Sequence, residues 1–199
     1  YVDDLYKAKS RQTNFVQQSY LANYNLDENK FYQDVILFDG TDYNNQVDLF
    51  VGGSPCQSFS IAGARGGLED TRGTLFYEFA RLIKEIQPKV FIYENVRGLL
   101  NHDDGKTWET MKNVFTNDLG YYIQDPQILN ASNFGIPQTR RRLFVVGFKQ
   151  KDFFEKFNYP STKELLYTMQ DFLEDNCSVS NFSYNSDGSL SIIKSIASP

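Results

Sequence analysis

The sequence predicts an α/β protein built on a mostly parallel sheet, because apolar runs of strand length alternate with amphipathic segments of helix length. The strand-length runs are residues 49–51, 90–93 and 143–148, and the clearest helical segment, residues 75–86, lies between the first two. With 199 residues, 41% of them hydrophobic, the chain can form one domain with a sizeable core and part of a second domain.

Two elements are predicted before residue 49. Residues 1–14 are polar and match no motif. An amphipathic helix is expected next, since apolar side chains recur at helical spacing: Phe15, Val16, Tyr20, Leu21 and Tyr24. The apolar run Val35–Phe38 is typical of a strand, and Asp39-Gly40 would end it.

The run Leu49-Phe50-Val51 has the length and residue types of a buried strand. The next two residues are glycines, which permit a tight turn, and Pro55 stiffens the backbone just before Cys56. A cysteine at the carboxyl end of a strand lies where ligands bind in open α/β sheets, which favours a nucleophile. A buried core residue is the alternative, because free cysteines are often buried.

A long connection and a second strand follow. Residues 58–74 include four glycines and are expected to form a functional lid or a disordered loop. The apolar residues of 75–86 recur with helical periodicity, and Pro88 lies just past the end of this helix. The apolar run at 90–93 is a predicted strand that leads directly into Glu94-Asn95-Val96.

The second half of the chain is predicted to continue the alternation. A helix is expected over residues 107–119, extended structure over 121–129, and a buried strand over 143–148. After Pro160 the spacing of apolar residues predicts one more helix over 165–173. Residues 176–199 are rich in Ser and Asn and are interpreted as the start of a second domain or as a tail.

Composition narrows the classes of function. Two cysteines and one histidine give neither a disulfide framework nor a recognisable metal site, so we expect no metal and a reducing, cytoplasmic location. No apolar run approaches the roughly 18 residues of a membrane span, so no membrane partner is expected. The net charge of −5 argues against a nucleic-acid partner. However, arginines cluster at 65, 72, 97 and 140–142, and local clustering matters more than the total.

Three candidate functional residue types follow or precede three different strands. Cys56 follows the first strand, Glu94 follows the second, and Arg140 and Arg142 precede the third. Alternate residues of a strand point to the same side, so these two arginines would share a side if the strand has already begun. We therefore expect a nucleophile, an acid and guanidinium donors to meet at one edge of the sheet.

At these positions the sequence resembles the cytosine-5 DNA methyltransferases. Pro55-Cys56-Gln57 is similar to the nucleophile motif of that family, Glu94-Asn95-Val96 to its Glu-Asn-Val motif, and Gln138, Arg140 and Arg142 to its Gln-x-Arg-x-Arg motif. Residues 70–76 resemble the segment that follows the mobile loop of the family. The resemblance covers roughly residues 15–160, and four motifs in the family's order are far more specific than any one of them.

The resemblance implies a doubly wound sheet of the S-adenosylmethionine-dependent methyltransferase type with a smaller target-recognition domain. Residues 1–160 would form the catalytic domain, and 161–199 the connection to, or start of, the recognition domain. Cys56 would attack C6 of a cytosine flipped out of double-stranded DNA, and Glu94 would hydrogen-bond and protonate N3. Arg142 and Arg140 would hold the base and the active site.

The resemblance also implies binding roles. S-adenosyl-L-methionine would be the cofactor, with Asp39, Pro55 and Leu75 lining its pocket. Arg65 and Arg72 of the 58–74 loop would contact DNA phosphates as the loop closes. The remaining expected DNA-binding residues are Gln57, Ser60, Asn95, Val96 and Gln138.

The sequence departs from the family at both ends. It contains neither the Phe-x-Gly-x-Gly turn that opens the catalytic domain nor the Gly-Asn-x-Val motif near its end. We therefore expect the catalytic domain to be incomplete at its N-terminus, with the rest of the same enzyme or a complementing polypeptide supplying the missing parts. A DNA methyltransferase of a restriction-modification system is the main hypothesis. An RNA (tRNA) cytosine-5 methyltransferase and a non-catalytic DNA-binding fragment or homologue are the alternatives.

Overall fold

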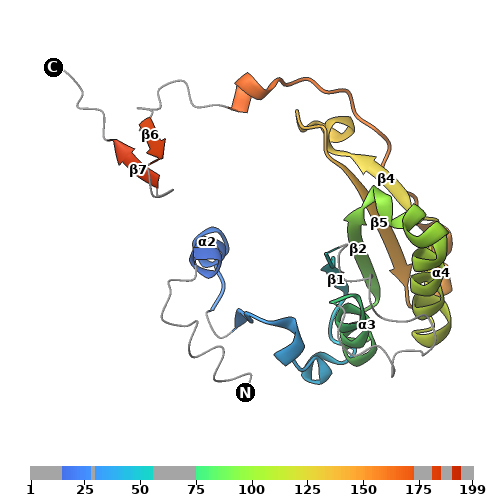
Figure 1. The fold of residues 1–199 in the computed structure, drawn as a ribbon. Coiled ribbons are helices and arrows are strands. Elements are labelled where there is room, and N and C mark those ends of the chain that lie inside the picture. The colour runs from blue at the N-terminus through green and yellow to red at the C-terminus, as the bar shows by residue number, and fades with distance from the viewer. Residues whose placement is uncertain (1–14, 28–29, 56–74, 173–180, 185–189, 194–199) are drawn as a thin grey trace. The chain divides into compact units, whose positions relative to one another are not determined.

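The computed structural model describes residues 15–27, 30–55, 75–172, 181–184 and 190–193 (Figure 1). The chain divides into two compact units, one formed by residues 1–129 with 141–159 and the other by 130–140 with 160–199. The predicted boundary at residue 160 between a catalytic and a recognition domain stays a prediction.

The first unit is built on a mixed sheet in which the strand order is β1-β2-β5-β3, with β4 also paired to β5. Strand β1 (Leu49–Gly52) pairs parallel with β2 (Val90–Val96), because helix α3 (Leu75–Ile86) lies between them in the chain and allows a crossover. Strand β5 (Arg141–Phe148) runs antiparallel to β2 and to β3 (Tyr122–Ile123). Strand β4 comprises Gln127–Asn130. The predicted α/β class is confirmed, and the described sheet is mixed.

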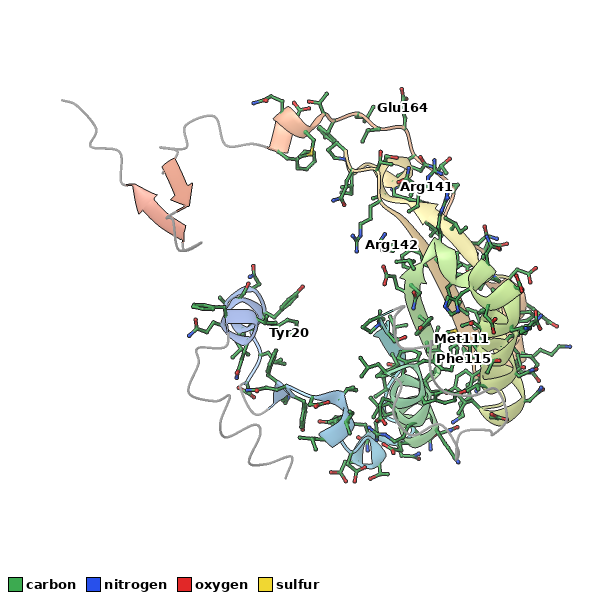
Figure 2. The ribbon with its side chains drawn as sticks, viewed as in Figure 1. Tyr20, Met111, Phe115, Arg141, Arg142 and Glu164 are labelled. Atoms are coloured by element: carbon green, nitrogen blue, oxygen red, sulfur yellow. The ribbon has the colours of Figure 1, made fainter. Side chains whose placement is uncertain are left out.

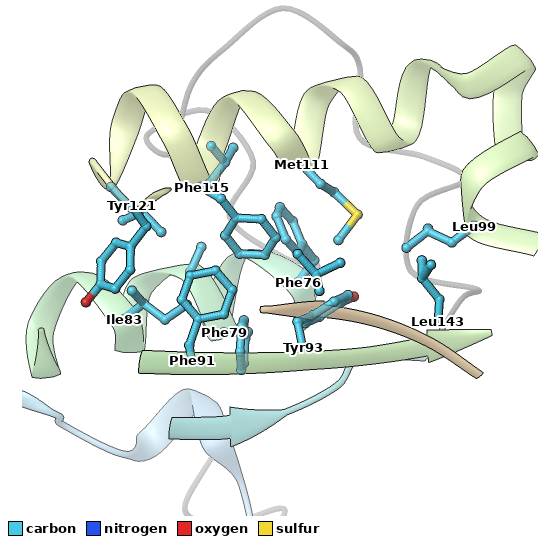
Figure 3. Packing of buried hydrophobic residues seen from close by; sticks show 14 residues of the cluster. Phe76, Phe79, Ile83, Phe91, Tyr93, Leu99, Met111, Phe115, Tyr121 and Leu143 are labelled. Atoms are coloured by element: carbon cyan, nitrogen blue, oxygen red, sulfur yellow. The ribbon is translucent and has the colours of Figure 1, made fainter. Parts of the chain in front are cut away.

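The hydrophobic core lies between one face of the sheet and two helices (Figure 3). Helix α3 provides Phe76, Phe79 and Ile83, and helix α4 (Lys106–Asn113) continues into a π-helical turn, η6 (Val114–Asp118), that provides Phe115. These side chains pack on Phe91 of β2, whose ring centroid lies 4.7 Å from that of Phe115. The predicted helices over 75–86 and 107–119 are confirmed.

Alternate residues of β2 point to the two faces of the sheet. Phe91, Tyr93 and Asn95 are buried beneath α3 and α4, whereas Ile92 and Glu94 point to the opposite face. On that opposite face, helix α5 (Lys151–Lys156) and the residues after it pack aromatic rings against Phe148.

Strand β1 forms as predicted but is not buried. Leu49 and Val51 are 52% and 60% exposed, because in the described part of the chain β1 has a neighbouring strand on one side only. Strand β2 also differs from the prediction, since it continues through Glu94 to Val96 instead of ending before the acid.

Residues 35–38 do not form the predicted strand. They form a short 3-10 helix, η2 (Val35–Leu37), whose first turn is capped by the Asp34 carboxylate accepting from the Ile36 N–H at 2.9 Å. The Arg81 guanidinium of α3 donates to the carbonyls of Val35 and Phe38 at 2.9 and 3.0 Å. A side chain therefore takes two of the bonds that a neighbouring strand would have made.

Two predicted amphipathic helices lack a buried face. Helix α2 (Phe15–Asn23) forms, but none of its residues is buried. The helix predicted over 165–173 is wrong except for a 3-10 turn, η8 (Met169–Phe172), because exposed apolar residues such as Leu166, 74% exposed, leave no packed face to stabilise it.

The remaining described elements are short. They are the 3-10 segments η3 (Thr41–Tyr43), η5 (Arg97–Gly105) and η7 (Ala131–Phe134), and a hairpin of β6 (Asn181–Tyr184) and β7 (Leu190–Ile193). None of the described helices is long and apolar enough to cross a bilayer.

Candidate active site

An ion pair joins the predicted acid to one of the predicted arginines. Nε of Arg142 lies 3.0 Å from Oε1 of Glu94. The sheet register explains the pairing. Arg142 of β5 lies directly opposite Val96 of β2, and Val96 is two residues beyond Glu94 on the same face. Figure 2 shows Arg142 beside Arg141 at the start of β5. Both side chains of the pair are partly exposed, at 26% and 36%, so the pair is open to a ligand.

The peptide that leads to Cys56 lies directly against Glu94. A Cβ atom on Gly53 would collide with the backbone carbonyl of Glu94 and would lie 3.2 Å from Oε2 of its side chain. Only glycine permits this approach, which explains its place after β1. The turn after β1 and the carboxylate of β2 are therefore adjacent, as the parallel pairing of these strands requires.

A buried polar network attaches this turn to β2 from the other face. The Ser54 hydroxyl lies 2.6 Å from the Tyr93 hydroxyl, and Nδ2 of Asn95 donates to the Ser54 carbonyl at 2.8 Å and to the Tyr93 hydroxyl at 2.9 Å. Ser54 and Tyr93 are not among the site residues that the motifs predict. The two-residue alternation of β2 could have identified Tyr93, because it places this hydroxyl beside Asn95 on one face.

Five predicted site residues lie outside the described part of the chain: Cys56, Gln57, Ser60, Arg65 and Arg72. Pro55, the last described residue before Cys56, is exposed. The structure thus describes the backbone up to the residue before the expected nucleophile.

Two further predicted residues belong to the second unit. Gln138 and Arg140 precede β5, which begins at Arg141, and both are exposed. The Arg140 carbonyl accepts from the Ala131 N–H at 3.0 Å, which closes the loop between β4 and β5. The proposed roles of Gln138, Arg140 and Val96 stay predictions, as does DNA contact by Asn95, whose amide is bonded within the network described above.

A cavity of about 460 Å³ opens beside the C-terminal end of β1. One wall comes from Val51, Gly52 and Gly53, another from Leu75 and neighbouring residues of α3. The other lining residues are mainly aromatic. They include Tyr20, Phe31, Tyr32 and Phe38, together with the cationic side chain of Lys30. Of the three predicted cofactor residues, Leu75 lines this cavity.

The other two predicted cofactor residues, Asp39 and Pro55, are not among the residues that line it. Oδ1 of Asp39 accepts from the backbone N–H and the hydroxyl of Thr41, at 2.9 and 2.7 Å. These two bonds, the side-chain bond above all, lower the pKa of the exposed Asp39 carboxyl. Asp39 is therefore ionised at neutral pH, and its role toward a cofactor stays a prediction.

Within the described residues, no three His, Cys, Asp or Glu side chains are grouped closely enough to hold a metal ion. Nδ1 of His102 lies 2.7 Å from the Thr107 hydroxyl at the start of α4.

Solved structures of methyltransferases share this fold. A likeness to the Entamoeba histolytica methyltransferase EhMeth has a TM-score of 0.61 and 18% identity and covers 88% of this chain and 53% of that one. A likeness to the S. pombe Dnmt2 methyltransferase has a TM-score of 0.52 and 22% identity and covers 79% and 50% of the two chains. These likenesses show that the chain shares the fold of these methyltransferases.

Sequence similarity places the chain in one family within this fold class. The model of the C-5 cytosine-specific DNA methylase family matches residues 7–196, so this chain belongs to that family. It is 49% identical over 130 residues to the type II methyltransferase M.HpaII of Haemophilus parainfluenzae, covering 65% of this chain and 36% of that protein. It is 51% identical over 143 residues to M.Eco47II of Escherichia coli, covering 71% and 34%.

A phage relative extends the similarity. The orphan methyltransferase M.SPRI of Bacillus phage SPR is 38% identical over 211 aligned residues, covering 92% of this chain and 47% of that protein. The chain thus spans between a third and a half of the length of these curated relatives.

Proposed function

We propose that this chain carries the catalytic centre of a DNA cytosine-5 methyltransferase, which transfers a methyl group from S-adenosyl-L-methionine to C5 of a cytosine flipped out of double-stranded DNA. The observation that carries the proposal is the close approach of Gly53, in the turn before Cys56, to Glu94, whose carboxylate pairs with Arg142. Membership of the C-5 cytosine-specific DNA methylase family supports the proposed reaction at these positions.

C5 of cytosine is a poor nucleophile because it belongs to an aromatic ring. In the proposed reaction the Cys56 thiolate forms a bond to C6, and the electron pair displaced from the C5–C6 double bond makes C5 nucleophilic. Glu94 hydrogen-bonds and protonates N3, which accepts the negative charge that the addition creates. After C5 has taken the methyl group, a base removes the C5 proton, the thiolate leaves C6, and Glu94 takes back the N3 proton. The target base must leave the duplex stack for the thiol to reach it.

The geometry supports a division of roles between Glu94 and Arg142. Nε of Arg142 binds only one carboxylate oxygen, Oε1. Oε2 faces the Gly53 turn, which precedes Cys56 in the chain. In this proposal Arg142 orients the carboxylate, and Oε2 remains available to N3 of the base. Arg140 completes the arginine pair, as the family motif implies.

The cavity beside β1 fits the proposed cofactor. Its aromatic side chains suit a flat purine and a cationic sulfonium, and it adjoins the glycine turn that precedes Cys56. S-adenosylmethionine bound there would supply an electrophilic methyl group. Leu75 would contact the adenosine, and Asp39 and Pro55 would border it, as the resemblance implies.

The partner proposed for the other predicted residues is double-stranded DNA. Arg65 and Arg72 would bind phosphates, and the polar residues Gln57, Ser60 and Gln138 would approach the target base or its neighbours. The relatives M.HpaII and M.Eco47II are named as type II methyltransferases, which supports a role in a restriction-modification system.

A covalent trap tests the proposal. DNA with 5-fluorocytosine at the target site is incubated with the full-length gene product and S-adenosylmethionine, and the products are separated on a denaturing gel. Methylation at C5 leaves fluorine where the proton would be, and a base cannot remove fluorine as a cation. The bond between sulfur and C6 then persists, so a protein–DNA band is expected.

Matched cysteine variants make this test specific. The band should be absent without cofactor, absent in Cys56→Ala and retained in Cys177→Ala. A band in Cys56→Ala, or none in a wild-type protein that methylates ordinary DNA, would contradict the covalent mechanism. Methyl uptake by tRNA in place of duplex DNA would identify the RNA alternative.

A further inference from the structure

The hydroxyl of Tyr93 forms hydrogen bonds with two residues that belong to different segments of the chain. It lies 2.6 Å from the Ser54 hydroxyl in the turn after β1 and accepts from Nδ2 of Asn95 in its own strand at 2.9 Å. All three residues are buried, with Tyr93 fully inaccessible. A hydroxyl pair between segments 39 residues apart, shielded from water, ties the turn to β2.

The bonds made by Asn95 in this network have a fixed direction. Oδ1 of Asn95 accepts from the Val96 N–H at 2.8 Å, so the amide nitrogen faces Tyr93 and the Ser54 carbonyl. The Tyr93 oxygen therefore accepts from Asn95, and its own proton is available to the Ser54 oxygen. Ser54 is bound through its hydroxyl and through its carbonyl.

The tyrosine ring packs in a way that does not require the hydroxyl. Its centroid lies 5.1 Å from that of Phe79 and 6.0 Å from those of Phe76 and Phe115, contacts that a phenylalanine would keep. In addition to these ring contacts, the hydroxyl bonds to Ser54 and accepts from Asn95. Both are directed at the turn that precedes Cys56.

We propose that the hydroxyls of Tyr93 and Ser54 form a latch that positions the turn before Cys56 against Glu94, which makes Tyr93 and Ser54 positioning residues. The latch acts from the helix-covered face of β2, whereas Glu94 and Arg142 lie on the opposite face. The turn is thus fixed by a side-chain bond on one side of β2 and by the close approach of Gly53 to Glu94. This inference rests on the proposed role of Cys56 as the nucleophile.

The experiment compares Tyr93→Phe and Ser54→Ala with Tyr121→Phe. Tyr121 is a matched control, because it is a buried tyrosine of the same core whose hydroxyl donates to the Pro88 carbonyl at 2.6 Å, near the start of β2. Each tyrosine variant loses one buried hydroxyl and keeps its ring. Amide hydrogen exchange of the peptide containing Gly53 and Ser54 is measured by mass spectrometry on the full chain, with the β5 peptide as an internal reference.

Faster exchange of the 53–54 peptide relative to β5 is expected in Tyr93→Phe and in Ser54→Ala, and unchanged relative exchange in Tyr121→Phe. In the full-length gene product we expect kcat to fall about 10- to 100-fold in the two latch variants, as for a small misplacement of reacting groups. The KM values for DNA and for S-adenosylmethionine should stay within about twofold, since the latch touches neither.

The double variant should be no slower than the slower single variant, because both substitutions break the same bond. Unchanged exchange and unchanged kcat in both latch variants would overturn the inference, as would an equal loss of kcat in Tyr121→Phe. A wild-type protein without methyltransferase activity would refute the proposed function instead. The exchange data would then decide by themselves whether the latch holds the turn.

Discussion

Replacement of Gly53 by alanine tests the geometry of the site most directly. The added methyl group would collide with the backbone carbonyl of Glu94 and lie 3.2 Å from Oε2 of its side chain. A backbone carbonyl in a paired strand cannot turn aside, so the turn before Cys56 must move away from Glu94 to restore ordinary contact distances. The substitution therefore separates the proposed nucleophile from the proposed acid.

The size of the effect follows from that displacement. A shift on the order of 1 Å between reacting groups can lower the rate by about 10²-fold. Overpacking costs about 1–3 kcal/mol of stability, and about 2–4 °C of melting temperature is lost per kcal/mol in a domain of this size. We expect kcat to fall by about 10²-fold while the protein remains folded at assay temperature.

Gly98→Ala is the matched control. Gly98 follows β2 in the η5 segment, and a Cβ atom there would meet nothing within 4 Å. Methyl transfer to duplex DNA and thermal unfolding are measured for both variants of the full-length gene product. Wild-type turnover in Gly53→Ala, or an equal loss in Gly98→Ala, would refute the inference that close approach of the turn to Glu94 serves catalysis.

Three other substitutions have expected outcomes. In Arg142→Gln the melting temperature should fall by at most a few degrees, because a partly exposed ion pair contributes only about 0–1 kcal/mol, whereas kcat should fall about 10²-fold. The control Arg141→Gln, next in the chain with its side chain on the other face, should match wild type in methylation assays. Equal losses of kcat in the two variants would contradict the role of Arg142. In Arg81→Met, loss of two carbonyl bonds and two ion pairs should lower the melting temperature by about 4–8 °C, whereas the exposed Lys84→Met should leave the calorimetric transition in place. Burial raises the pKa of the Tyr121 hydroxyl, so this group ionises more readily in the unfolded chain. The free energy of unfolding should therefore decline as the pH rises above about 10. Urea titrations of Tyr121→Phe should show a smaller decline.

The sequence by itself determined the elements whose periodicity is strong and local. Helix α3 and strands β2 and β5 lie where apolar spacing predicts them, because each pattern reflects contacts with a single core. The motifs around Cys56, Glu94 and Arg142 were also sufficient to indicate the family, since four short patterns in one order are unlike any chance arrangement.

Local patterns were insufficient where a distant residue decides the conformation. The apolar run at 35–38 resembles a strand, but Arg81, more than forty positions later in the chain, binds its carbonyls and a 3-10 turn forms instead. The segment at 165–173 has helical spacing, but its described apolar residues, up to Phe172, pack against no core in the described part of the chain and remain exposed.

Only the tertiary structure decided how the site residues meet. Strand register places Arg142 diagonally across from Glu94, and the parallel pairing of β1 with β2 brings Gly53 onto the Glu94 carbonyl. The same pairing aligns the Ser54 hydroxyl with Tyr93, a residue that an apolar run of the sequence presents only as core. Register depends on the packing of whole strands, and a shift of one residue would turn Glu94 to the opposite face of the sheet, so no motif within a single segment can specify these contacts.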